Sequence, residues 1–194
     1  MLDKSFVLVG ALIGSGGAVA YLGDTLRGRV KPNRVSFLLW SIVPMIAFAA
    51  QVQQGVGLEA LMTFSTGFLP LLTFAATFIN KKAEWKVSRF DLACGFLSLL
   101  GLALWLVTKV GNLAILLSIL ADALAALPTL AKAYRHPETE LAWPWLATCV
   151  GVVLTLLTLE SWTFANSGFI VYIFLVDLLI YCVVRFRLGT RGRR

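Results

Sequence analysis

The chain has 194 residues, of which 59% are hydrophobic and only 14% are charged. A soluble domain of this length cannot bury so much apolar surface, so the composition indicates an integral membrane protein. The formal net charge of +7 does not indicate nucleic acid, because the basic residues cluster at the ends of apolar stretches, where they suit anionic lipid headgroups. The expected partner is therefore a lipid bilayer and not a nucleic acid.

Seven apolar stretches are long enough to cross a bilayer, which takes about 20 mostly apolar residues. In chain order they cover residues 5–23, 33–52, 57–79, 91–108, 112–132, 141–160 and 166–186. The sequence therefore predicts an all-α integral membrane protein with seven transmembrane helices, in which residues 1–194 form a single transmembrane domain.

Lysine and arginine residues fall in alternate gaps between these stretches. Fifteen of the seventeen lie on one side, namely Arg27, Arg29, Lys31, Arg34, Lys81, Lys82, Lys86, Arg89, Lys132, Arg135, Arg185, Arg187, Arg191, Arg193 and Arg194. Only Lys4 and Lys109 lie on the other side. Because positive charge stays cytoplasmic, we expect the N-terminus outside and a basic cytoplasmic tail at 187–194, in a bacterial plasma (inner) membrane.

The first stretch has a second interpretation. Lys4, the apolar run and the small residues at 18–20 are also typical of a signal peptide with its cleavage site. The stretch is rich in small residues that permit close helix packing, with a hinge as the alternative role. These glycines are Gly10, Gly14, Gly16 and Gly17.

The stretches superimpose when the chain is shifted by 108 residues, which indicates an internal repeat. The first pairs with the fifth, the second with the sixth and the third with the seventh. Residues 1–80 are then a first three-helix repeat, 81–110 a linker helix and 111–186 a second repeat. The linker makes the two repeats run in the same direction, an arrangement that occurs in secondary transporters with the substrate site between the repeats. A chance match of spacing is the alternative.

Residues 127–140, LPTLAKAYRHPETE, resemble the PQ-loop motif, in which Pro-Gln near a helix end leads into a basic loop. Thr129 stands where the motif has Gln, and residues 21–33 resemble the motif more weakly. On these segments the chain resembles the SWEET / PQ-loop (MtN3-like) superfamily of seven-helix membrane transporters. The resemblance implies a 3+1+3 arrangement of helices over nearly the whole chain. It also implies that Pro44 and Pro128 are hinges, with Pro144 as a third candidate.

Two acidic residues, Asp122 and Asp177, lie in the middle of apolar stretches. Each is about ten residues, or roughly 15 Å, from the outer end of its helix, which places it near the centre of the bilayer. An aspartate there costs about 2.5–3.5 kcal/mol, and no Lys or Arg is expected at that depth. The expected partners are Ser118, Tyr172, Thr66, water, a proton or an external cation. Both residues are therefore candidates for proton coupling or for holding a cationic solute, and interhelical hydrogen bonding is the alternative.

Trp40 lies deeper in its helix than the other tryptophans and is a candidate for stacking on a substrate, with packing as the alternative. The remaining five are expected in interfacial belts: Trp85, Trp105, Trp143, Trp145 and Trp162. The sugar sites of SWEET-like proteins imply Asn and Trp side chains, and no Asn lies mid-helix here. Asp177 therefore favours a basic or proton-coupled substrate over a plain sugar.

These features predict a transporter that moves a small polar or cationic solute by alternating access, with proton coupling through the aspartates as an open option. A seven-helix receptor or sorting protein that binds its ligand without transporting it is the alternative. We expect no catalytic activity, because the chain contains no GxSxG, HExxH or His/Cys cluster. No cofactor or metal is expected either, since Cys94, Cys149 and Cys182 lack ligand spacing. A homo-oligomer remains open.

Overall fold

The computed structural model describes residues 2–3, 5–53, 60–107 and 111–189. Within these ranges the chain forms seven α-helices, two short 3-10 helices and no strand. The elements are α1 (Phe6–Leu26), α2 (Arg34–Gln53), α3 (Ala60–Ile79), η1 (Lys81–Ala83), α4 (Arg89–Val107), α5 (Gly111–Arg135), η2 (Pro137–Thr139), α6 (Ala142–Leu156) and α7 (Phe164–Phe186). The all-helical prediction is confirmed for the described residues.

Four helical segments are long and apolar enough to cross a membrane. They are α1 (Phe6–Leu26), α4 (Arg89–Val107), the part of α5 from Ile115 to Arg135 and the part of α7 from Asn166 to Phe186. The described apolar segments of α3 and α6, Thr66–Ile79 and Ala142–Leu156, are shorter than 18 residues. The helices therefore support the membrane class that the composition predicts.

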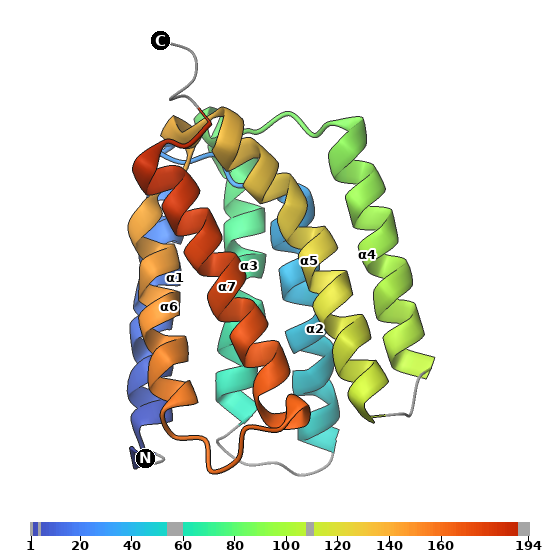
Figure 1. Ribbon diagram of the computed structural model, residues 1–194. Helices are drawn as coiled ribbons and strands as arrows, with labels where there is room; N and C mark the ends of the chain where they lie inside the picture. The colour runs from blue at the N-terminus through green and yellow to red at the C-terminus, as the bar shows by residue number, and fades with distance from the viewer. Residues whose placement is uncertain (1, 4, 54–59, 108–110, 190–194) are drawn as a thin grey trace.

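The helices lie side by side in one bundle, and the start of α1 and the end of α7 lie at opposite ends of it (Figure 1). Helix α1 packs against α6 and α3, and α2 packs against α3, α5 and α4. Helix α7 packs against α6 and α5, whereas α4 lies at the edge of the bundle against α5. We call the end where α1, α3, α5 and α7 begin the N-terminal end, and the opposite end the basic end.

The basic end carries all of the described positive charge. Lys4, Lys109, Arg191, Arg193 and Arg194 lie outside the described residues, as does part of the predicted tail at 187–194. The other twelve of the seventeen Lys and Arg residues all lie at the basic end. Gly28 adopts a left-handed φ of 70° in the turn after α1, and a Cβ there would lie 2.7 Å from the Lys82 Cβ. Glycine is therefore required for this turn to fit against η1.

Close approach between α1 and α6 depends on paired glycines. A Cβ added to Gly10 would lie 2.5 Å from the Gly151 carbonyl oxygen, and one added to Gly17 would lie 3.0 Å from the Ala147 Cβ. The predicted packing role is thus confirmed for these two residues. At Gly14 and Gly16 an added Cβ meets nothing within 4 Å, so the packing role does not extend to them.

The buried apolar core sits toward the basic end. It contains Tyr21, Val30, Phe37, Ala133, Trp145, Ile180, Val183 and Val184. Trp145 belongs to this core, with 9% of its surface exposed, and its placement in an interfacial belt was wrong. The reason is tertiary: Trp145 lies one turn into α6, on the side that packs against Tyr21 of α1 at 6.0 Å between ring centroids.

Candidate functional site

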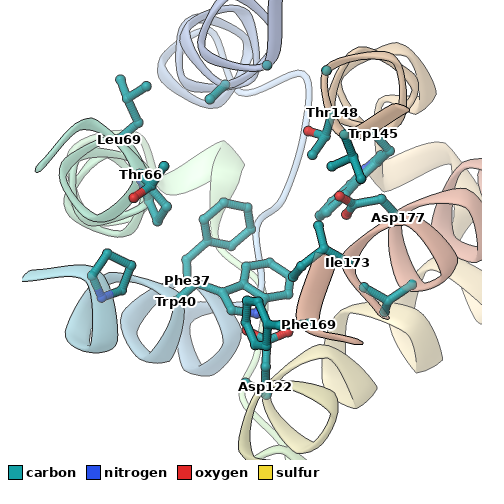
Figure 2. Close-up of a pocket in the computed structure, with 18 of the residues that line it drawn as sticks. Phe37, Trp40, Thr66, Leu69, Asp122, Trp145, Thr148, Phe169, Ile173 and Asp177 are labelled. Atoms are coloured by element: carbon teal, nitrogen blue, oxygen red, sulfur yellow. The ribbon is translucent and has the colours of Figure 1, made fainter. Parts of the chain in front are cut away.

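A cavity of about 690 Å³ lies inside the bundle, lined by residues from all seven helices (Figure 2). Along α1 its lining begins at Val7, next to the N-terminal end, and finishes at Tyr21. A cavity of this size is in the range that holds a small organic molecule. Gly14, whose missing side chain meets no neighbour, is part of the lining, so its small size enlarges the cavity.

Four aromatic rings line the part of the cavity that lies toward the basic end. The centroid distances are 5.2 Å between Tyr21 and Phe37, 5.3 Å between Phe37 and Trp40, and 5.9 Å between Trp40 and Trp145. Trp145 also contacts Tyr21, so the four rings form a closed circuit. All four line the cavity. We call Tyr21, Phe37, Trp40 and Trp145 the aromatic floor.

A buried ion pair lies behind the aromatic floor. Lys132 of α5 pairs with Glu140, and their side chains are 1% and 0% exposed. The Tyr21 hydroxyl donates to Glu140 Oε2 at 2.8 Å, and the Lys132 ammonium donates to the Lys31 carbonyl oxygen. The Lys132 ammonium also lies 5.5 Å from the centroid of the Trp85 ring. This Lys132–Glu140 network joins α1, α5 and the segments that lead into α2 and α6.

The sequence analysis did not find the Lys132–Glu140 network. It placed Lys132 in the loop after a helix ending at 132, whereas α5 continues to Arg135 and carries Lys132 as a buried helical residue. The sequence carried one local signal. Lys132 lies between Ala131 and Ala133, whereas most of the other basic residues have a polar or charged residue directly beside them. Glu140 gives no such signal, because its burial depends on the docking of η2.

Asp122 lies in the cavity wall on α5. Its Oδ2 accepts a hydrogen bond of 2.8 Å from the Tyr172 hydroxyl of α7, which was one of the partners expected from the sequence. The Trp40 side chain lies beside the same carboxyl group (Figure 2). Three helices thus meet at Asp122, and Trp40 connects this group to the aromatic floor.

Asp177 lies in the cavity wall on α7 and is 8% exposed. Figure 2 shows its carboxyl group beside Trp145 and Thr148 at the edge of the cavity. Among the residues that the structure describes, none hydrogen-bonds this carboxyl group, and its principal electrostatic neighbour is Asp122. The cavity therefore contains one hydrogen-bonded and one unpartnered carboxyl group.

The structure brings most of the predicted site residues together around the cavity. The lining includes Asp122, Asp177, Trp40, Thr66, Ser118 and Pro44. Tyr172 reaches the site through Asp122, while Pro128 is fully buried outside the lining. The described lining residues include two acidic side chains and no Lys, Arg or His.

Metal-binding chemistry has little support in the described part of the chain, where no group of three or more His, Cys, Asp or Glu side chains is placed to hold an ion. Cys94 and Cys149 are buried and Cys182 is partly buried, all as free thiols. Comparisons of the chain with protein-family models, curated proteins and solved structures give no match.

Proposed function

We propose that this protein is a seven-helix membrane transporter that moves a small polar or cationic solute by alternating access. The observation that carries the proposal is the cavity, which begins near the N-terminal end, contains two carboxyl groups and stops at the aromatic floor. A solute pathway blocked at one end is what one state of an alternating-access transporter requires.

The helix contacts support a 3+1+3 arrangement of the SWEET / PQ-loop kind. Under the 108-residue shift, the α1–α3 contact corresponds to α5–α7, and the α2–α3 contact corresponds to α6–α7. The contact between α1 and α6 corresponds to that between α5 and α2. Both members of each correspondence are in contact, and α4 lies outside both sets of three (Figure 1). This correspondence supports a parallel repeat in addition to the matching spacing of the apolar stretches.

The charge distribution supports an N-out, C-in orientation in a bacterial inner membrane. All twelve described Lys and Arg residues lie at the basic end, and the positive-inside rule assigns such an end to the cytoplasm. The cavity then faces the outside, and the aromatic floor separates it from the cytoplasm. Anionic headgroups on the cytoplasmic leaflet would meet the basic end.

Opening toward the cytoplasm would require the floor to separate. The hydrogen bond from Tyr21 to Glu140 and the one from Lys132 to the Lys31 carbonyl would have to break. Pro44 in α2 and Pro128 in α5 lie inside helices, where the missing N–H weakens the helix locally. They are the hinges we propose for this movement, and protonation of Asp122 or Asp177 is the coupling event we propose.

Accessibility from each side of the membrane tests this proposal without knowledge of the solute. Ala18 lines the cavity on α1, so we would label Ala18→Cys with a membrane-impermeant methanethiosulfonate in right-side-out and inside-out vesicles. Alternating access predicts labelling from both sides. The wild-type chain, with its native cysteines, gives the background, and Leu12→Cys on the exposed side of the same helix is the matched control.

Labelling of Ala18→Cys from the outer side alone, whatever solutes are present, would contradict transport. It would favour the alternative of a receptor or sorting protein, which binds its ligand without passing it through the floor.

A further inference from the structure

The cavity is lined by two acidic side chains, and its described lining contains no basic side chain. The carboxyl group of Asp177 is more than nine-tenths buried, lines the cavity and accepts no hydrogen bond from any described residue. A second carboxyl group, that of Asp122, interacts with it electrostatically. A buried carboxylate without a partner is costly, and a positively charged occupant of the cavity would remove that cost.

Aromatic rings form the adjacent surface of the same cavity. Figure 2 shows Phe37, Trp40 and Phe169 in the cavity together with both carboxyl groups. Aromatic faces attract cations through the ring quadrupole and also cover apolar groups. The site thus offers a cationic group two kinds of attraction, and it offers an apolar body a surface to pack against.

We propose that the solute of this cavity is an organic cation with an apolar body and no carboxylate, such as an arylalkylamine or alkylamine. Its ammonium group pairs with Asp177 and Asp122, and its body packs on the rings of Trp40 and Phe169. This inference rests on the proposed function, because it names the class of solute that the transporter moves.

The same lining disfavours two common classes of solute. An amino acid carries a carboxylate, which needs a basic partner, and the described lining contains no Lys, Arg or His. That carboxylate would also be repelled by Asp122 and Asp177. A sugar is neutral, so its hydroxyl groups would leave the two acidic residues without a counter-charge.

Matched pairs of compounds test the inference on the purified full-length protein. Tyramine, tryptamine and 3-methylbutylamine would be compared with tyrosine, tryptophan and leucine, which differ from them by the carboxylate. Phenethylamine would be compared with 2-phenylethanol, which lacks the charge. We expect each bound amine to exceed its partner in affinity by about tenfold or more, measured by calorimetry.

Variants of Asp177 test whether the amine binds at the proposed site. We expect Asp177→Asn to weaken amine binding by about tenfold or more, and Asp177→Glu, which keeps the charge, to retain part of it. The matched control is Glu138→Gln, because the Glu138 side chain is 58% exposed and pairs with His136 at the surface. Thermal unfolding of each variant without ligand shows that the variant is folded.

Three results would overturn the inference: no binding by any of the amines, equal or tighter binding by the amino acids or the alcohol, or amine binding that Asp177→Asn leaves unchanged. Uptake of a bound radiolabelled amine into proteoliposomes separates this inference from the proposed function. Binding without uptake would contradict transport alone. Uptake of a sugar or an amino acid, with no amine bound, would contradict the amine inference alone.

Discussion

The basic end of the bundle and the cavity each contain a buried carboxyl group, but only the one at the basic end is paired. At the basic end, Glu140 is fully buried and is paired with Lys132 and Tyr21. In the cavity, Asp177 is buried to a similar degree but has no hydrogen-bond partner among the described residues. Burial alone therefore does not distinguish a structural acid from a functional one. The two groups differ in their partners: the paired acid joins helices at the basic end, and the unpartnered acid is the one that we propose for a ligand.

The largest expected effect is at the paired acid. Lys132→Met leaves the Glu140 carboxylate buried without its cation, so we expect the free energy of unfolding to fall by about 3–5 kcal/mol. Chemical unfolding in mixed micelles measures this loss. The exposed Lys82→Met is the matched control, and adding Glu140→Gln to Lys132→Met is expected to recover much of the stability. Equal losses for Lys132→Met and Lys82→Met would show that the network does not stabilise the basic end.

Two glycines on α1 compare a packed position with a cavity position. Gly10→Ala places a Cβ against the Gly151 carbonyl oxygen, so we expect a loss of about 1–3 kcal/mol from overpacking. In Gly14→Ala the new methyl group enters the cavity and meets nothing within 4 Å. Thermal unfolding of both variants checks the difference. A Gly14→Ala variant as unstable as Gly10→Ala would contradict the hollow interior.

The link between the aromatic floor and the Lys132–Glu140 network can be weakened without removing a charged group. Tyr21→Phe deletes the hydroxyl that donates to Glu140, and the lost hydrogen bond to a buried carboxylate costs about 1–3 kcal/mol. Because this bond ties the floor to the network behind it, we also expect faster labelling of Ala18→Cys from the cytoplasmic side. Tyr181→Phe is the control, since that hydroxyl has no hydrogen-bond partner among the described residues. Unchanged labelling would separate the network from gating.

The smallest expected effect on stability is at the unpartnered Asp177. Here we expect substitution to leave the free energy of unfolding unchanged or to raise it, whereas the other substitutions lower it. Asp177→Asn removes a buried carboxyl group that no described residue satisfies, so we expect stability to stay the same or to rise by up to about 1 kcal/mol. Thermal unfolding in the absence of solute measures it. A clear loss of stability would mean that Asp177 has a structural partner after all, and the contrast with Glu140 would disappear.

The site was partly predictable because depth in a membrane follows from position in an apolar stretch. Asp122 and Asp177 were expected at similar depth, and both line one cavity. The Tyr172 hydroxyl was expected as a partner and does bond to Asp122. Trp145 and Lys132 were misplaced, because each lies near a helix end. At a helix end, the residue at which the helix stops and the docking of the next segment decide whether a side chain faces lipid, water or the protein core.

The sequence by itself determined the membrane class, the helical architecture and the position of the two aspartates in the middle of their helices. These properties depend on the length of apolar stretches and the order of charges along the chain, which no folding step alters. Only the tertiary structure decided that Phe37 and Trp145 join Tyr21 and Trp40 in one floor, and that Glu140 has a partner while Asp177 has none. Those outcomes depend on how each helix is rotated about its axis and on which neighbours its ends meet, and both are set by packing between distant segments.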